Sequence, residues 1–248
     1  MPQANRKLSV SIIIPTLNEE KNLPLLVKRI PRGVASEIIV VDGHSSDGTV
    51  AVAKKLGLRT VMQEGKGLGN AYRTGAKAAK GELIVILDAD GSHMPEDIPL
   101  LLKKANEGFD LVVGSRLKGG VQSKDMTFFR LYANYLIAFT MRLLFSVPLT
   151  DPWMGFRAIN RKKFLALATS APGQEVDLEI EIKAKKNGMR IAEVATFEPQ
   201  RIHGSSKFNV FFDGLRAGVL FARELILPHE SHRESWLLEF IHRVQMRF

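Results

Sequence analysis

Short apolar runs alternate with segments of helical periodicity through the first half of the chain. Each apolar run has the length of a strand, and each periodic segment repeats its apolar residues at intervals of three and four. The strands predicted from this pattern are 9–14, 37–41, 60–62, 83–87, 110–114 and 190–197. The predicted helices are 23–30, 49–56, 68–79, 97–105, 128–145, 175–186, 210–227 and 236–248. This alternation predicts an α/β fold, with a mostly parallel Rossmann-like sheet and helices on both of its faces.

The strand predicted at 83–87 is apolar throughout and stops abruptly at Asp88, with Asp90 two residues further on. A continuous apolar run is typical of a strand buried on both faces of a parallel sheet. The carboxyl ends of such strands face the ligand crevice, so both carboxylates are expected in the site. Two oxygen ligands at this spacing can share a divalent ion that water and substrate phosphates complete. An ordinary turn is the alternative interpretation, because Asp and Gly are common turn residues.

The segment 175–186 contains two conflicting signals. Its apolar residues alternate in period two, which taken alone indicates a strand. Acids come first and lysines last, the pairs Glu179/Lys183 and Glu181/Lys185 have helical spacing, and the segment stops at Asn187. These features favour a helix.

Three later helices are rich in apolar residues. The helix at 128–145 carries only Arg130 and Arg142 as charges. It is either a buried core helix or an interfacial helix whose arginines face lipid phosphates. The helices at 210–227 and 236–248 are amphipathic and fit either the surface of a soluble protein or contact with a membrane. We expect no transmembrane helix, because no uncharged apolar stretch is long enough.

Length, cysteine content and net charge restrict the classes of protein to which the chain can belong. The 248 residues suit one large catalytic domain, 1–227, followed by an amphipathic tail, 228–248. The absence of cysteine excludes disulfides and thiolate metal sites, and the polar, basic N-terminus resembles neither a signal nor a transit peptide. The net charge of +9 predicts attraction to polyanions. A nucleic-acid partner is disfavoured, because the basic residues follow strand ends beside carboxylates.

Two loops on the amino-terminal side have ambiguous roles. The first strand lacks the G-x-G-x-x-G fingerprint of dinucleotide-binding domains, and the loop around Lys66 is neither that fingerprint nor a P-loop. It is either a flexible basic loop in which Lys66 reaches a phosphate or ribose, or an ordinary helix entry. Asp42 ends the second strand as Asp88 ends the central one, and Ser46 or Asp47 is the expected N-cap of the helix that follows.

Cations and one acid follow the later predicted strands. Arg116 comes just after the strand at 110–114, and the turn at 151–157 could present Asp151 to the site. The loop that begins at Arg201 also contains Ser206 and Lys207, so it offers several hydrogen-bond donors to phosphate oxygens. Both groups fall after strands and can meet the metal carboxylates at one edge of the sheet.

Short motifs spread along the chain have a recognisable order and spacing. They are Pro15-Thr16-x-Asn18-Glu19, Asp42, Gly67-Leu68-Gly69-x-Ala71-Tyr72, Asp88-Ala89-Asp90 with Ser92-His93, Gly114-Ser115-Arg116, Gly155-Phe156-Arg157 and Arg201-x-x-Gly204-x-Ser206-Lys207. Together they resemble the polyprenol-phosphate (dolichol-phosphate) mannose synthases, which are family 2 inverting glycosyltransferases of GT-A fold. The chain departs from many members at Gly43, where they have a second Asp, and from some at Ser92, where they have Gln.

The resemblance implies a role for each matching residue. Asp88 and Asp90 would hold Mg²⁺ or Mn²⁺ against the donor diphosphate, and with Arg116 and Arg201 they form the expected catalytic set. The expected nucleotide-sugar site comprises Pro15, Leu17, Glu19, Val41, Asp42, Lys66, Ala89, Arg116 and Lys207. The expected acceptor-phosphate site comprises Arg116, Arg130, Arg201, Ser206 and Lys207.

The implied activity is metal-dependent transfer of mannose from GDP-mannose to a polyprenyl phosphate with inversion. A related enzyme that uses UDP-glucose would share nearly every motif. A catalytically inactive module that binds anionic lipid is the non-enzymatic alternative. The expected location is the cytoplasmic face of a membrane, held peripherally, and a membrane-anchoring partner subunit is left open.

Overall fold

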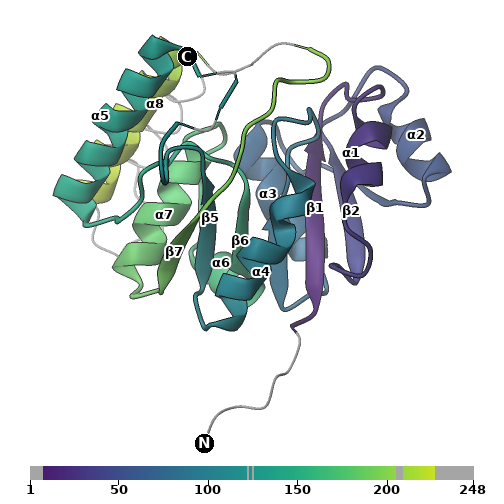
Figure 1. Cartoon of the computed structure of the whole chain (residues 1–248), viewed down its shortest axis with the longest axis horizontal. Helices are drawn as coiled ribbons and strands as arrows, with labels where there is room; N and C mark the ends of the chain where they lie inside the picture. The colour runs from purple at the N-terminus through teal and green to yellow at the C-terminus, as the bar shows by residue number, and fades with distance from the viewer. Residues whose placement is uncertain (1–7, 122, 125, 205–208, 227–248) are drawn as a thin grey trace, which may run out of the picture.

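The computed structural model describes residues 8–121, 123–124, 126–204 and 209–226. Within these residues, seven strands form one sheet in the order β3-β2-β1-β4-β6-β5-β7 (Figure 1). The strands are β1 (Val10–Thr16), β2 (Glu37–Asp42), β3 (Arg59–Met62), β4 (Leu83–Ile86), β5 (Leu111–Ser115), β6 (Arg157–Asn160) and β7 (Ile191–Ala195). All neighbouring pairs are parallel except those that β6 forms with β4 and β5. The mostly parallel sheet predicted from the sequence is confirmed.

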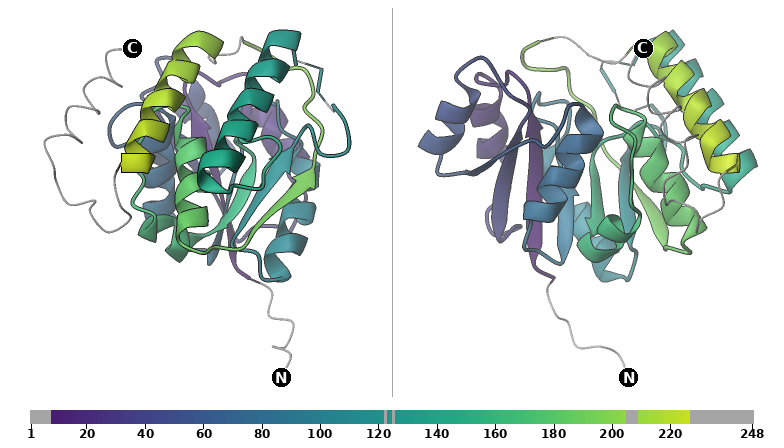
Figure 2. Two further views of the ribbon diagram at one scale, coloured as in Figure 1. Left: turned by 90° about the vertical axis from the view of Figure 1, so that its left-hand side faces the viewer. Right: turned by 180° about the vertical axis from the view of Figure 1, so that it is seen from behind.

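Helices cover both faces of the sheet. They are α1 (Leu23–Arg29), α2 (Thr49–Lys55), α3 (Leu68–Ala78), α4 (Ile98–Asn106), α5 (Phe128–Phe145), α6 (Arg161–Ala166), α7 (Val176–Lys186) and α8 (Val210–Ile226), with a 3₁₀ turn at Pro95–Asp97. One face carries α1 and α4, and the other carries α3, α6 and α7 (Figures 1 and 2). Every residue of β4 is buried, as its apolar run predicts for a central strand.

Two elements between α5 and α7 were not predicted from the sequence. Strand β6 enters the sheet between β4 and β5 in the antiparallel direction, so that Arg157 pairs with Ile86 and Val113. Its first residue therefore lies at the edge where the parallel strands end. The short helix α6 follows directly. The expected strand at 190–197 is also shorter than predicted, and the tail 228–248 lies outside the described residues.

The segment at 175–186 is a helix, as its capping and charge pattern favoured. Glu179 pairs with Lys183 at 2.8 Å as predicted, but both side chains are buried. The expected pairing of Glu181 with Lys185 is wrong, because Glu181 is fully buried and faces Arg157 instead. Apolar residues two apart are spread around a helix rather than along one side, which is typical of a helix enclosed on all sides.

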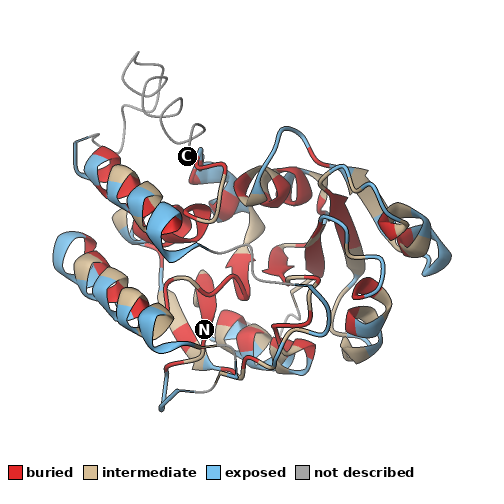
Figure 3. Cartoon of the chain, turned by 90° about the horizontal axis from the view of Figure 1, so that it is seen from above, coloured by how far each residue is buried: buried red, intermediate tan, exposed pale blue. Residues whose placement is uncertain are grey.

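Helices α5 and α8 pack side by side at one end of the sheet, over α7 (Figures 1 and 2). Their outward faces are exposed (Figure 3) and carry large apolar side chains. Those side chains include Phe128, Phe129, Tyr132, Tyr135, Leu136, Phe139 and Leu143 on α5, and Phe211, Phe212, Leu215, Leu225 and Ile226 on α8. The interpretation of α5 as a buried core helix is therefore wrong for most of its surface. Within the described residues, no helix combines the length and apolar character that a bilayer crossing requires.

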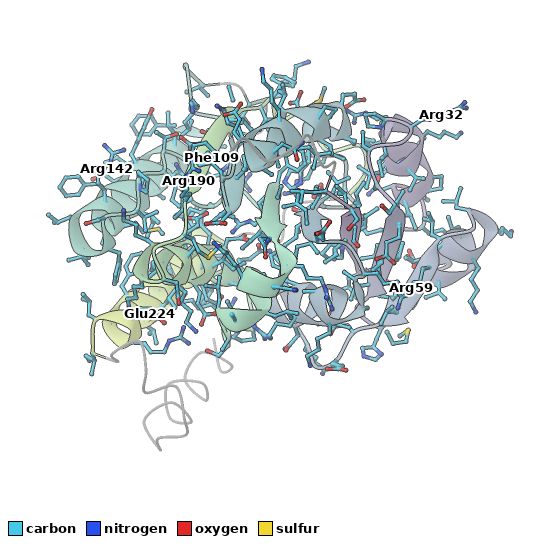
Figure 4. The ribbon with its side chains drawn as sticks, turned by 90° about the horizontal axis from the view of Figure 1, so that it is seen from below. Arg32, Arg59, Phe109, Arg142, Arg190 and Glu224 are labelled. Carbon is cyan, nitrogen blue, oxygen red and sulfur yellow. The ribbon has the colours of Figure 1, made fainter. Side chains whose placement is uncertain are left out.

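At the edge of the sheet where the parallel strands begin, two arginines make contacts near the starts of neighbouring strands. The guanidinium of Arg190 lies 4.7 Å from the centroid of the Phe109 ring, and both residues are labelled in Figure 4. Arg59 opens β3 there and pairs with Glu37 at 3.1 Å. At this edge, therefore, the arginines link residues near the starts of neighbouring strands.

Candidate active site

The turn after β4 presents Asp88 and Asp90 at the carboxyl edge of the sheet. Their side chains are 33% and 15% exposed, so both remain partly open to solvent. The backbone N–H and the hydroxyl of Ser92 donate to Asp90 Oδ1 at 2.9 and 2.6 Å. Gly91 takes a positive φ of 82°, and the side chain of Ile202 packs so closely against it that a Cβ there would lie 2.8 Å from Ile202 Cδ1.

Arg201 comes from the loop after β7 and pairs with the same turn. Its Nη1 lies 2.8 Å from Asp90 Oδ2, and the next residue, Ile202, donates its backbone N–H to the Asp90 carbonyl at 3.3 Å. Asn22 of the loop before α1 donates to the carbonyl of His203 at 3.2 Å. The structure thus brings together two loops separated by more than a hundred residues, as their positions after strands predicted. Ser206 and Lys207 lie outside the described residues.

His93 contacts both the backbone and the side chain of Asp88. Its Nδ1 accepts the backbone N–H of Asp88 at 3.1 Å, so the neutral ring carries its proton on Nε2, 3.7 Å from Asp88 Oδ2. The ring is buried and stacks on Phe156 at a centroid distance of 5.4 Å. His93 therefore fixes the orientation of the turn that carries the acidic pair.

The two carboxylates have unlike electrostatic environments. Burial raises the pKa of Asp88, and the negative charge of Asp90 raises it further, although His93 and Arg201 oppose both effects. Burial alone would also raise the pKa of Asp90, but Arg201 and the hydrogen bonds from Ser92 outweigh it and lower that pKa. A divalent cation between the two carboxylates would offset their mutual repulsion.

The donor set suits Mg²⁺ or Mn²⁺. Carboxylate oxygens are the ligands these ions prefer, and such sites usually keep several waters and substrate oxygens in the coordination sphere. Across the described part of the chain, no group of three or more acidic, histidine or cysteine side chains could enclose a metal on its own. A metal held by Asp88 and Asp90 would therefore need water or substrate oxygens to complete its coordination.

The residues expected at the nucleotide lie at the ends of β1 and β2. Pro15 and Val41 are register partners across these strands. Leu17 is 42% exposed, whereas Val41 and Asp42 are fully buried, and Asp42 Oδ2 accepts the backbone N–H of Ser45 at 2.9 Å. Nucleotide contact by the side chains of Val41 and Asp42 remains a prediction that this geometry does not support.

Two further residues expected at the nucleotide, Glu19 and Ala89, lie in the loop before α1 and in the turn after β4. Glu19 accepts a hydrogen bond from Asn22 at 2.7 Å, and Ala89 is buried within the acidic turn. The helix that follows β2 begins at Thr49 and its N-cap is Gly48, so the expectation of Ser46 or Asp47 at that position is wrong, although Asp47 accepts the backbone N–H of Thr49 at 3.0 Å.

The loop around Lys66 is a tight helix entry. Gly67 takes a positive φ of 90°, and a Cβ there would lie 2.3 Å from the Pro172 carbonyl oxygen. Gly69 donates its backbone N–H to the same oxygen at 2.9 Å. Close backbone approach, rather than phosphate binding, thus accounts for these two glycines. The Lys66 side chain is exposed, and its contact with donor phosphates stays a prediction.

Arg116 is more firmly bound than the sequence suggested. Its Nε and Nη2 donate to the two carboxylate oxygens of Asp151, each at 2.7 Å, and its Nη1 donates to Glu198 at 3.1 Å. Asp151 therefore anchors Arg116 and does not present a free acid to the site. Arg130 lies in the first turn of α5, whose N-cap is Thr127. A phosphate role for either arginine remains a prediction.

A fully buried charged cluster beneath Asp88 was missed by the sequence reasoning. Arg157 pairs with Asp177 at 2.9 Å and faces Glu181 at 3.6 Å, and each of these side chains is at most 3% exposed. Burial raises the pKa of Asp177 to about 7, with Arg157 opposing it, and burial raises the pKa of Glu181 well above its usual value. The motif Gly155-Phe156-Arg157 was a sequence signal, but its spacing did not reveal which acids would surround the arginine.

This GT-A-like sheet, with its acidic pair at the carboxyl edge, is the architecture of a glycosyltransferase. The chain belongs to glycosyl transferase family 2, whose model matches residues 11–167. It is 34% identical over 212 residues to the polyprenol monophosphomannose synthase of Mycolicibacterium smegmatis, covering 80% of each chain. It is also 32% identical over 223 residues to the dolichol-phosphate mannosyltransferase of Pyrococcus furiosus, covering 84% of this chain and 62% of that protein.

A solved structure with a similar fold is glucosyl-3-phosphoglycerate synthase from Mycobacterium tuberculosis in complex with Mn²⁺, uridine diphosphate and phosphoglyceric acid. The TM-score is 0.72 at 23% identity, and the match covers 89% of this chain and 80% of that one. At this identity the likeness establishes the fold.

Proposed function

We propose that the chain transfers mannose from GDP-mannose to a polyprenyl phosphate, with inversion at the anomeric carbon. The observation that carries this proposal is the similarity to the two mannosyltransferase relatives, which extends over 80% and 84% of the chain. The non-enzymatic alternative, an inactive lipid-binding module, is disfavoured by membership of a glycosyltransferase family and by the intact acidic pair.

The divalent ion of this reaction would be held by Asp88 and Asp90. When bound, such an ion supplies positive charge that stabilises the departing nucleoside diphosphate. The partly exposed carboxylates and the hydrogen bonds that orient Asp90 support this assignment.

The protein itself would supply positioning and charge. A lipid monophosphate has a second pKa near 6, so its attacking oxygen is already an anion at neutral pH and needs little help from a general base. Donor and acceptor are both anionic and repel each other. Arg201, which lies against the acidic turn, would bring a cation between them, and a guanidinium can bind phosphate through two parallel hydrogen bonds. Ser206 and Lys207 would add donors from the same loop.

The exposed apolar face of α5 and α8 would rest on the cytoplasmic surface of the membrane that contains the acceptor. Exposed Phe and Tyr side chains on α5 and exposed Phe side chains on α8 support this orientation, as does the net charge of +9, which favours anionic lipid. The attachment would be peripheral, through side chains that enter the headgroup region.

Donor choice separates this proposal from the UDP-glucose alternative. The test incubates the purified chain with a polyprenyl phosphate, Mn²⁺ and either radiolabelled GDP-mannose or radiolabelled UDP-glucose, followed by organic extraction. We expect label in the organic phase with GDP-mannose and little with UDP-glucose. The reverse pattern would establish the alternative, and label in neither extract would overturn the proposed acceptor.

A further inference from the structure

Arg157 is the largest fully buried side chain among the described residues. Its guanidinium lies between the turn that precedes β6 and the first turn of α7. Removing an arginine from water is costly, and well-packed apolar residues in place of buried ion pairs often leave a protein equally stable or more so. Core packing alone therefore does not explain an arginine here.

The contacts of Arg157 join two segments that are distant in sequence. Its Nη2 donates to the Met154 carbonyl at 2.6 Å and its Nε to the Gly155 carbonyl at 3.3 Å. Its Nη1 donates to the Asp177 carbonyl at 3.3 Å. The guanidinium thus fixes the turn at 154–155 relative to the start of α7.

The acids behind Arg157 keep the guanidinium in place. Asp177 lies 2.9 Å from Nη2 and Glu181 lies 3.6 Å from it, both on α7 and both buried. Arginine offers five donors in one rigid plane, whereas lysine offers a single point charge on a flexible stem. Only arginine can hold these carbonyls at the same time.

The turn fixed by Arg157 forms one wall of the Asp88 environment. A Cβ added at Gly155 would lie 3.5 Å from Asp88 Oδ2, 3.5 Å from His93 Cε1 and 3.3 Å from Tyr72 Oη. Gly155 therefore lies against the carboxylate assigned to the metal. A displacement of the turn would change the space that this carboxylate has.

We propose that Arg157 is a positioning residue for the donor site, which holds the 154–155 turn against Asp88 in the arrangement that metal-dependent diphosphate binding requires. This inference rests on the proposed function, because it takes Asp88 and Asp90 as the metal ligands. Groups that support a metal ligand from the outer shell typically contribute roughly tenfold to a hundredfold in metal affinity or activity.

The test compares Arg157→Lys and Gly155→Ala with the wild-type chain. Arg157→Lys keeps the buried charge but loses the planar fork of donors. Gly155→Ala keeps Arg157 and adds a methyl group 3.3 Å from Tyr72 Oη, a tight contact that either the turn or Tyr72 must relieve by a small shift. Arg161→Lys is the matched control, because Arg161 also donates to two backbone carbonyls, those of Ala76 and Lys77, but follows the other end of β6.

The measurement is calorimetric titration of GDP in the presence of Mn²⁺, at a temperature at which circular dichroism shows each variant to be folded. We expect the dissociation constant to rise roughly tenfold to a hundredfold in Arg157→Lys and Gly155→Ala, and to stay unchanged in Arg161→Lys. A structural role alone would lower the melting temperature and leave the binding of the folded protein intact.

The possible outcomes distinguish failure of the role inferred for Arg157 from failure of the proposed function. Wild-type affinity in folded Arg157→Lys and in Gly155→Ala would overturn the inference and leave the proposed function standing. If Arg157→Lys does not fold, Gly155→Ala decides. If the wild-type chain itself does not bind GDP with Mn²⁺, the proposed function fails, and the inference falls with it.

Discussion

Replacing Arg201 with glutamine should change metal affinity and turnover in opposite directions. Arg201 Nη1 lies 2.8 Å from Asp90 Oδ2, while Asp90 Oδ1 accepts two hydrogen bonds from Ser92. Both oxygens of Asp90 are therefore engaged, and a metal that binds Oδ2 competes with the positive charge of the guanidinium. Arg201→Gln removes the competing charge and should tighten binding of the metal alone. Under the proposed function it also removes a cation that would lie between the donor and acceptor phosphates, so turnover should fall.

The size of each effect follows from the geometry. The two side chains are 22% and 15% exposed, so solvent screens the pair only in part. A hydrogen bond to a charged group at such a site contributes about 1.5 kcal/mol, or roughly tenfold in Mn²⁺ affinity. Losing a preorganised contact to developing charge costs about 2 to 4 kcal/mol, or roughly thirty-fold to a thousand-fold in turnover.

The assay pairs two measurements on the same protein. Electron paramagnetic resonance of free Mn²⁺ gives the metal affinity without nucleotide, and steady-state transfer to a short polyprenyl phosphate gives the turnover number. Arg201→Lys should lower turnover far more than it weakens metal-dependent GDP binding, because lysine cannot bind phosphate in bidentate fashion. Arg59→Gln is the control, since it breaks a 3.1 Å pair with Glu37 at the opposite edge of the sheet. Weaker Mn²⁺ binding in Arg201→Gln, or unchanged turnover, would refute the reasoning.

Three further predictions concern the metal, the membrane and acid stability. Asp90→Asn should abolish turnover and weaken Mn²⁺-dependent GDP binding, and full activity of this variant in EDTA would disprove the metal assignment. Flotation with anionic liposomes should show binding that falls with added salt and with Phe129→Ser or Phe139→Ser on the exposed face of α5; resistance to carbonate extraction would contradict peripheral attachment. Burial opposes ionisation of Glu179, but Arg223 and Lys183 lower its pKa to about 2, so its contribution to stability is present above its usual pKa of 4.5 and is lost as pH falls toward 2. Glu179→Gln should leave Lys183 without its carboxylate partner and Arg223 with Glu224 alone, lower the unfolding free energy at pH 7 by about 3 to 5 kcal/mol, and flatten the acid dependence measured by urea titration.

The order of strands and helices could be predicted because its signal is local. The run before Asp88 is apolar at every position, and a strand enclosed on both faces requires this. Strand β6 escaped prediction because it has only four residues, begins with an arginine and follows a predicted turn that does not reveal the strand's direction. Its place between β4 and β5 depends on pairing with distant residues, which local periodicity does not report.

The position of the candidate site could likewise be predicted from the sequence. Strand ends located Asp90 and Arg201 at the same edge, because parallel strands all end there. The partners of each charge could not be read from spacing. The helical spacing suggested that Glu181 pairs with Lys185, but α7 is enclosed and Glu181 faces Arg157, which comes from another element. The partners of a buried charge depend on tertiary contacts, and those contacts cannot be read from the sequence alone.

The reversed direction of β6 makes the connection that precedes it part of the active edge. Every parallel strand reaches the active edge at its last residue, but β6 reaches it at its first, so the chain arrives there from α5 along the segment 146–156. The segment is anchored by the buried side chains of Val147 and Leu149, by the backbone N–H of Thr150, which donates to Glu193, and by Asp151, which accepts from Arg116. A substitution in this connection can therefore shift Gly155 and Arg116 at the active edge while the pairing of every strand stays the same.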